Sequence, residues 1–347
     1  MVKISVIIPN YNRAKIVSET VENMLLQSLP PHEIIVVDDC STDDSVSVLK
    51  SFGNKITLIQ QAENRGPGAA RNAALRIVTG DFVQFMDSDD LSSLNKLQHQ
   101  SAILEETDGD IVYSPWVRGY FLKKVFHPED VVLQQQALPT VKDMLTWFIT
   151  EWSIIFQQCL FRRVFLEKVG FYREDMRLYE DGEFFVRLLL AGPKVVFTKN
   201  VLTLYRSENP EDHDKLTGSG SNAQRKAMDT AHFFNIVIEL LAKERHPVLG
   251  HWRFRLNVWR ALRDMQKLEH IDQENLSKLK LITRGREWDM LDWLDKKWGG
   301  FRQRIRGHRW PSSYQAGPLT EQQKSLIREI GYEIFWEKKR AWHYLIF

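Results

Sequence analysis

The chain has 347 residues, of which 43% are hydrophobic and 27% are charged, and its formal net charge is +2. A disordered chain would combine low apolar content with a large net charge, so this composition predicts a folded, globular protein. The near-neutral charge argues against a dedicated nucleic-acid-binding protein. Two cysteines, Cys40 and Cys159, are too few for a disulfide framework or a cysteine-based zinc site.

The N-terminal run 4–8 is β-branched and ends at Pro9, which predicts a strand and not a signal peptide. No apolar run approaches the ~18 residues that a membrane-spanning helix requires. Together with the low cysteine content, these features lead us to expect a cytoplasmic protein.

Short β-branched runs alternate with longer helical patterns in the first hundred residues. Such alternation indicates βαβ units and a mostly parallel sheet covered by helices. Ligands of these sheets bind at the carboxyl ends of the strands, so the residues after each strand matter most. The patterns predict strands at 4–8, 33–37, 56–60 and 82–86, and helices at 15–27, 45–52 and 68–78.

Beyond residue 140 the patterns are mainly helical. Helices are predicted at 141–149, 164–169 and 183–191, and a strand at 195–197. The stretch Thr217-Gly-Ser-Gly-Ser-Asn222 has the composition of a flexible linker. From Ala223 onward the pattern is helical with no clear strand. We therefore expect an α/β domain over 1–216 and a helical, tryptophan-rich and basic region over 217–347.

The first two predicted strands end in polar residues. Pro9-Asn10-Tyr11-Asn12 follows the first strand without the glycines of a dinucleotide-binding loop, which argues against a nicotinamide or flavin enzyme. Tyr11 suits stacking on a nucleobase, although its position alone favours a cap on the core. Asp38 and Asp39 end the second strand, where a carboxylate suits a ribose hydroxyl or a base N–H.

Three carboxylates within four residues follow the strand at 82–86, in the sequence Asp87-Ser88-Asp89-Asp90. Such charges repel one another unless a cation or a proton intervenes. Hard oxygen ligands in this arrangement suit Mg²⁺ or Mn²⁺ bound together with substrate phosphates. The alternative is a capped turn before a helix.

Charged residues at three further places in the sequence are candidates for the site. Arg71 lies near the start of a helix, where the helix dipole does not favour a cation, so it suits a base or a phosphate. Glu180 and Asp181 precede an apolar helix, a place where carboxylates more often cap than catalyse. Arg206 ends a later strand.

The order of these motifs resembles that of family 2 glycosyltransferases, over roughly residues 1–210. That resemblance implies a GT-A fold and inversion at the anomeric carbon. The motifs that carry it are Val6-Ile-Ile-Pro-Asn-Tyr-Asn12, Val36-Val-Asp-Asp-Cys-Ser-Thr-Asp43, Asn64-Arg-Gly66, Ala70-Arg-Asn72, Asp87-Ser-Asp-Asp90, Glu180-Asp181 and Tyr205-Arg206.

The resemblance also implies a role for each site residue. Asp181 is the expected general base, and Asp89 the expected ligand of Mn²⁺ or Mg²⁺ in the D-x-D motif. Tyr11 is expected near the nucleobase with Asp39 and Arg71. The expected donor-binding residues are Pro9, Tyr11, Asp39, Arg71, Asp87, Ser88 and Arg206, of which Arg206 supports the diphosphate or a closing loop.

We therefore expect a metal-dependent inverting glycosyltransferase that uses a nucleotide-sugar donor, with UDP as the first choice of nucleotide. The expected acceptor is a glycan or a lipid-linked glycan, in the biosynthesis of a polysaccharide or glycolipid. Two alternatives remain open at this point: a non-catalytic protein that binds sugar nucleotides or glycans, and a nucleotidyltransferase.

Most tryptophans lie beyond the linker, and the segment 296–310 interleaves basic and aromatic residues without any acidic residue. This pattern suits peripheral contact with an anionic membrane at its cytoplasmic face. It fits a solvated loop over a tryptophan-rich core equally well.

Overall fold

The computed structural model describes residues 2–128, 132–138, 140, 143–151, 154–207, 222–266 and 317–335, together with 279–280, 282–283, 288 and 291–293. The expected linker around 217 and the basic, aromatic segment 296–310 lie outside the described residues. None of the described helices is long and apolar enough to cross a bilayer.

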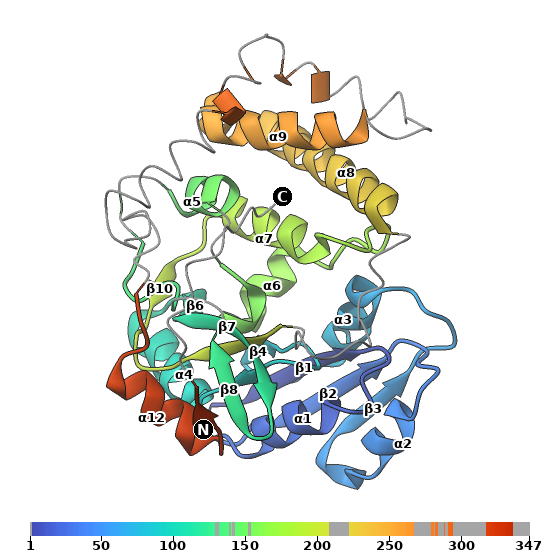
Figure 1. The fold of residues 1–347 in the computed structure, drawn as a ribbon, viewed down its shortest axis with the longest axis vertical. Coiled ribbons are helices and arrows are strands. Elements are labelled where there is room, and N and C mark those ends of the chain that lie inside the picture. The colour runs from blue at the N-terminus through green and yellow to red at the C-terminus, as the bar shows by residue number, and fades with distance from the viewer. Residues whose placement is uncertain are drawn as a thin grey trace.

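A seven-stranded sheet crosses the lower half of the molecule in the view of Figure 1. Its strand order is β10-β6-β9-β4-β1-β2-β3. Strands β4, β1, β2 and β3 run parallel, as predicted, whereas β9 is antiparallel to both of its neighbours. The strands are β1 (Ile4–Asn10), β2 (Glu33–Asp38), β3 (Thr57–Gln60), β4 (Phe82–Phe85), β6 (Ile111–Tyr113), β9 (Leu160–Arg162) and β10 (Val195–Phe197).

Helices cover both faces of this sheet because alternate residues of its strands point to opposite sides. Val6 and Ile8 of β1 pack in a core with α1 (Val17–Leu25), α2 (Ser45–Lys50) and α4 (Lys96–Thr107). Ile7, between them, packs in the core on the other face. That face is covered by α3 (Pro67–Leu75), α5 (Met144–Glu151), α6 (Arg163–Val169) and α7 (Glu180–Leu190).

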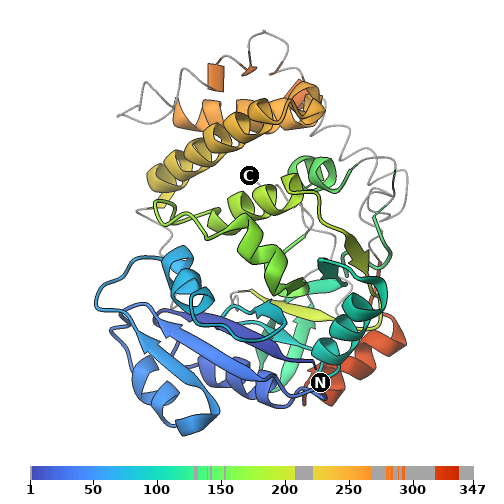
Figure 2. The same ribbon diagram turned by 180° about the vertical axis from the view of Figure 1, so that it is seen from behind.

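Two further helices, α8 (Asn222–Lys243) and α9 (Trp252–Met265), form a layer at the far end of the molecule from the sheet (Figures 1 and 2). They pack on each other, on α7 and on α5. Their buried side chains, such as Phe234 and Phe254, continue the core that begins at the sheet. Short 3₁₀ helices lie at η1 (Gly53–Lys55), η2 (Phe156–Gln158) and η3 (Pro247–Gly250).

A second sheet of five strands runs in the order β12-β8-β7-β11-β5. The prediction of no strand after residue 223 is wrong, because β12 pairs with β8 and α12 (Glu321–Glu329) packs against this sheet. A two-residue strand is too short to show any periodicity in sequence. The strands are β5 (Leu91–Ser92), β7 (Trp116–Leu122), β8 (Val125–Pro128), β11 (Thr203–Arg206) and β12 (Glu333–Ile334).

The boundary of one helix matters for the site. Helix α7 begins at Glu180, three residues before the predicted start at 183. Asp181 therefore lies in the first turn of the helix and not in the loop before it. Tyr179, directly before the helix, has a left-handed backbone conformation with φ of 64°.

Candidate active site

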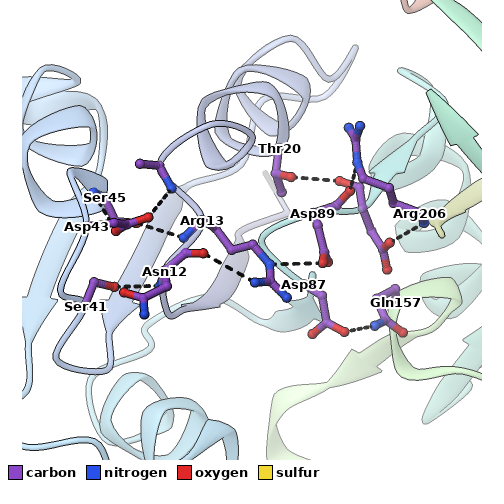
Figure 3. Close-up of polar contacts among 12 residues, drawn as sticks. Asn12, Arg13, Thr20, Ser41, Asp43, Ser45, Asp87, Asp89, Gln157 and Arg206 are labelled. Atoms are coloured by element: carbon purple, nitrogen blue, oxygen red, sulfur yellow. Dashed lines mark hydrogen bonds and ion pairs between the residues drawn. The ribbon is translucent and has the colours of Figure 1, made fainter. Parts of the chain in front are cut away.

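The carboxyl ends of β1 and β2 are joined by a network around Asp38. Asn10 Nδ2 donates to Asp38 Oδ1 at 2.9 Å, and the backbone N–H of Ser41 donates to Asp38 Oδ2 at 2.9 Å. The Ser41 hydroxyl in turn accepts from the backbone N–H of Asn12 at 2.9 Å (Figure 3). Asp38 therefore holds together the loops that follow β1 and β2. Asp39, the next residue, makes other contacts.

Asp39 fixes the loop that precedes α3. Its two carboxylate oxygens accept the backbone N–H groups of Arg65 and Gly66, each at 2.8 Å, and the residue is only 4% exposed. Gly66 has φ of 90°, a conformation that favours glycine. Tyr11 directly follows β1, which pairs with β2, and 44% of its surface is exposed. Pro9 lies within β1, opposite Val37 of β2.

Arg71 connects two parts of the site. Its guanidinium donates to Asp87 Oδ1 at 2.8 Å and to Glu180 Oε1 at 2.7 Å, and it lies over the ring of Tyr172. The residue is 5% exposed. Arg71, near the start of α3, therefore pairs with one carboxylate in the turn after β4 and one at the start of α7. It brings the Asp87 turn and the Asp181 helix to one place.

The turn after β4 presents two partly exposed carboxylates. Asp87 Oδ2 accepts a hydrogen bond from the side-chain amide of Gln157, and Asp89 Oδ2 lies 3.3 Å from Arg13 Nε (Figure 3). About a third of the Asp87 side chain and a quarter of the Asp89 side chain are exposed. Ser88, between them, is buried.

Arg206 holds the same turn from the second sheet. Its Nε donates to the backbone carbonyl of Asp89 at 2.6 Å, and its backbone N–H donates to Asp90 Oδ1 at 2.7 Å. A third contact joins its guanidinium to Glu19 Oε2 at 2.6 Å. These contacts tie β11 to the carboxylate turn and to Glu19 of α1.

The electrostatics of the turn favour a cation. Burial and the charge of Asp87 raise the pKa of Asp89, although Arg13 opposes this effect. Burial and the two neighbouring aspartates raise the pKa of Asp90 still more. The buried Asp90 Oδ2 has no hydrogen-bond partner among the described residues. A divalent cation at the turn would relieve this repulsion.

The donor set of this turn also fits Mg²⁺ or Mn²⁺. These ions accept one or two carboxylates and complete their coordination with water and substrate phosphates. Within the described ranges no cluster of three or more His, Cys, Asp or Glu side chains forms a complete metal cage. Asp89, with Asp87 beside it, would therefore hold the ion in part, and the phosphates of a donor would supply further oxygens.

Asp181 lies half-buried in the first turn of α7, and its Oδ1 accepts the backbone N–H of Gly182 at 2.7 Å. Burial raises its pKa, Arg71 lowers it and Asp87 raises it again, with a net increase. Next to it, burial and the charge of Asp181 raise the pKa of Glu180 to about 7. A carboxylate with a raised pKa is suited to accept a proton near neutral pH.

The cation that favours ionised Asp181 is Arg71. Two other arginines near α7 have different partners: Arg177 donates to the side chain of Asn64, and Arg187 pairs with Glu183 at 2.8 Å. Sequence proximity alone would have assigned them to the wrong carboxylate.

Two residues at the site were missed by sequence reasoning, Arg13 and Gln157. Arg13 directly follows the Pro9–Asn12 motif, which could have drawn attention to it. Gln157 lies in η2, 70 residues after its partner Asp87, and carries no local signal. Only the packing of η2 beside β4 brings this pair together.

Part of the chain matches a known protein family. Residues 5–170 match the family model described as glycosyl transferase family 2. The chain is 38% identical over 117 residues to the Staphylococcus aureus poly(ribitol-phosphate) beta-N-acetylglucosaminyltransferase TarS, covering 32% of this chain and 20% of TarS. It is 40% identical over 154 residues to the Bacillus subtilis putative teichuronic acid biosynthesis glycosyltransferase TuaG, covering 42% of this chain and 61% of TuaG.

Solved structures show the same fold. Residues 1–349 of S. aureus TarS superpose with a TM-score of 0.52 at 21% identity, covering 89% of this chain and 93% of that one. A mannosyltransferase from Pyrobaculum calidifontis superposes with a TM-score of 0.50 at 17% identity, covering 89% and 88%. The motifs at the ends of β1, β2 and β4 lie within residues 5–170, the part of the chain that matches glycosyl transferase family 2.

Proposed function

We propose that the protein is a metal-dependent, inverting glycosyltransferase that transfers a sugar from a nucleoside diphosphate to a glycan acceptor. The observation that carries this proposal is the Arg71 bridge. One guanidinium contacts Asp87 in the carboxylate turn and Glu180 next to Asp181. The group proposed to anchor the donor and the group proposed to activate the acceptor are thereby held on either side of one fixed residue.

In this mechanism Asp181 removes the proton from the acceptor hydroxyl as that oxygen attacks the anomeric carbon. The pKa of Asp181 is raised toward neutral pH, and a general base is most effective when its pKa lies near the working pH. Attack from the face opposite the leaving diphosphate inverts the configuration in a single displacement. A divalent ion at Asp89, when bound, supplies positive charge that stabilises the leaving diphosphate.

The residues at the ends of β1 and β2 are proposed to bind the nucleoside. Exposed Tyr11 offers a ring for stacking on the base, and the Asp39 oxygens that hold the 65–66 loop retain lone pairs for a base N–H. UDP is the first candidate nucleotide. TarS residues 1–349 have been solved in complex with UDP-GlcNAc, whereas the P. calidifontis mannosyltransferase has been solved with GDP-Man and Mn²⁺.

The acceptor is proposed to be a glycan or a lipid-linked glycan. The names of TarS and TuaG refer to poly(ribitol-phosphate) and to teichuronic acid biosynthesis, which supports a cell-surface polymer as the class of product. Peripheral contact of segment 296–310 with the cytoplasmic face of a membrane would place the enzyme beside a lipid-linked acceptor.

We also propose that the chain has two regions, a catalytic domain over 1–216 and a C-terminal region over 217–347.

Release of free nucleotide from a panel of UDP, dTDP and GDP sugars, with Mg²⁺ and with Mn²⁺, tests the proposal. We expect turnover with at least one donor, and loss of that turnover in Asp89→Ala. Glu105→Ala, which removes an exposed carboxylate on α4, serves as the control and should retain turnover. Binding of a sugar nucleotide without any hydrolysis or transfer would favour a non-catalytic binding protein instead.

A further inference from the structure

Arg13 lies at the candidate donor site and has no part in the mechanism above. It follows β1, and its backbone N–H donates to the Ser45 hydroxyl at 2.9 Å, which fixes the loop. Its side chain extends from this loop toward the carboxylate turn, where Nε lies 3.3 Å from Asp89 Oδ2 (Figure 3). Roughly a fifth of the side chain is exposed.

The other arginines at the turn are committed elsewhere. Arg71 binds Asp87 and Glu180, and the guanidinium of Arg206 binds the Asp89 carbonyl and Glu19. Among the described contacts, Arg13 supplies the guanidinium that meets the Asp89 carboxylate itself. Apart from Asp89, its side chain has a single described contact, a 3.3 Å hydrogen bond from NH1 to the carbonyl of Asn12.

A guanidinium and a divalent ion at the same carboxylate oppose each other. Both are cations, so each reduces the attraction that the other feels toward Asp89. An anion placed against both reverses this effect, because it is attracted to each of them. A diphosphate has the required charge, and the planar guanidinium fork matches phosphate oxygens.

We propose that Arg13 binds the diphosphate of the donor and couples metal binding to nucleotide binding. This inference rests on the proposed function, since it assumes a cation at Asp89. Without nucleotide, Arg13 weakens the binding of the metal ion. With nucleotide, it strengthens the ternary complex, so the cation and the donor bind together in preference to the cation alone. The coupling is reciprocal by thermodynamic linkage.

The test measures two affinities whose expected changes have opposite signs. Free Mn²⁺ is titrated by electron paramagnetic resonance without nucleotide, and UDP is titrated by calorimetry at saturating Mn²⁺. Arg13→Gln should bind Mn²⁺ alone more tightly and UDP more weakly, each by roughly tenfold, within the range of ~5–150-fold found for coupled sites. Lys55→Gln, which removes an exposed positive charge at the end of η1, should change neither affinity.

Arg13→Lys provides a second variant, because it keeps the charge and loses the planar fork. It should leave Mn²⁺ binding near the parental value and weaken UDP less than Arg13→Gln does. If Arg13 only supported the local structure, Arg13→Gln would bind both Mn²⁺ and UDP more weakly, and that result would overturn the proposal. Unchanged Mn²⁺ affinity in Arg13→Gln would overturn it as well.

Asp89→Ala separates this inference from the proposed function. If Asp89→Ala binds Mn²⁺ as tightly as the parent, the metal does not lie at Asp89 and both proposals fail. If Asp89→Ala loses Mn²⁺ while Arg13→Gln changes neither affinity, the proposed function stands and the role of Arg13 is wrong.

Discussion

Replacing Arg71 by methionine should destabilise the fold strongly and in a pH-dependent manner. Arg71 is 5% exposed and makes two ion pairs, at 2.7 Å to Glu180 and at 2.8 Å to Asp87. The Glu180 side chain is 8% exposed, so the variant would leave a buried carboxylate without its partner. Removing one member of a buried pair costs about 3–5 kcal/mol. Asp87 adds little, because about a third of its side chain is exposed and solvent screens that pair.

The pH dependence follows from Glu180, whose pKa already stands at about 7 with Arg71 present. Without the guanidinium its pKa in the folded state rises further, while its pKa in the unfolded chain is unchanged. The variant's native state therefore holds a proton at pH values where the parent's native state has released it. The stability difference grows as pH rises, by about 1.4 kcal/mol for each pH unit over which one extra proton is held.

Urea unfolding followed by tryptophan fluorescence, at pH 8.5 and at pH 5.5, measures this difference. Arg71→Met should lose ~3 kcal/mol or more at pH 8.5 and clearly less at pH 5.5. The double variant Arg71→Met/Glu180→Gln should recover part of the loss, because the stranded charge is gone. Arg76→Met is the matched control. Arg76 is about half exposed and pairs with Glu174 at 3.5 Å, so it should lose at most ~1 kcal/mol.

Two outcomes would show that the Arg71–Glu180 pair does not stabilise the fold in this way. One is a loss at pH 8.5 no larger than that of the Arg76 control. The other is a double variant as unstable as Arg71→Met alone, which would show that the stranded Glu180 charge is not the cause.

Three further predictions address other parts of the molecule. Asp181→Asn should keep its affinity for UDP, by calorimetry, while transfer slows by roughly 10²- to 10⁴-fold; an unchanged rate would direct the search for the base to Glu180. Lys96 is fully buried and burial lowers its pKa to about 7, so the parent should gain stability as pH rises from 7 to 9. Lys96→Met should lack this slope in urea unfolding. The parent protein should sediment with liposomes that contain anionic lipid at low salt, and a variant in which arginines 302, 304 and 306 are replaced by glutamine should sediment less. Equal sedimentation of the two proteins would rule out the membrane contact.

The parallel half of the fold could be predicted because each strand and helix there is long enough to show its period. Strand β1 is predicted at 4–8 and extends to Asn10, α1 lies within its predicted range, and α3 begins at Pro67, one residue before its predicted start. The second sheet could not be predicted in the same way. Its strands β5 and β12 contain two residues each, and tertiary pairing fixes them where no local pattern exists. Strand β9 enters the main sheet antiparallel, which a three-residue run cannot reveal.

In the site, too, the residues with a local sequence pattern could be predicted and those placed by long-range packing could not. The carboxylates at the ends of β2 and β4 were visible in sequence, because a strand end in a parallel sheet is where ligands bind. The partners of those carboxylates were not visible. Glu180 meets Arg71 across 109 residues, and Arg206 meets Asp89 across 117. Such contacts depend on how α7 and β11 pack, and this information is spread over the whole core.

A single displacement inverts the configuration at the anomeric carbon, so the anomer that is first released from the donor distinguishes it from a mechanism with retention. The protein is mixed with an α-linked nucleotide sugar that it turns over, with Mn²⁺ present, and proton NMR follows hydrolysis in which water takes the place of the acceptor. We expect the β-anomer to appear first and the α-anomer to grow only later, through mutarotation in solution. First appearance of the α-anomer would contradict single displacement with Asp181 as the base.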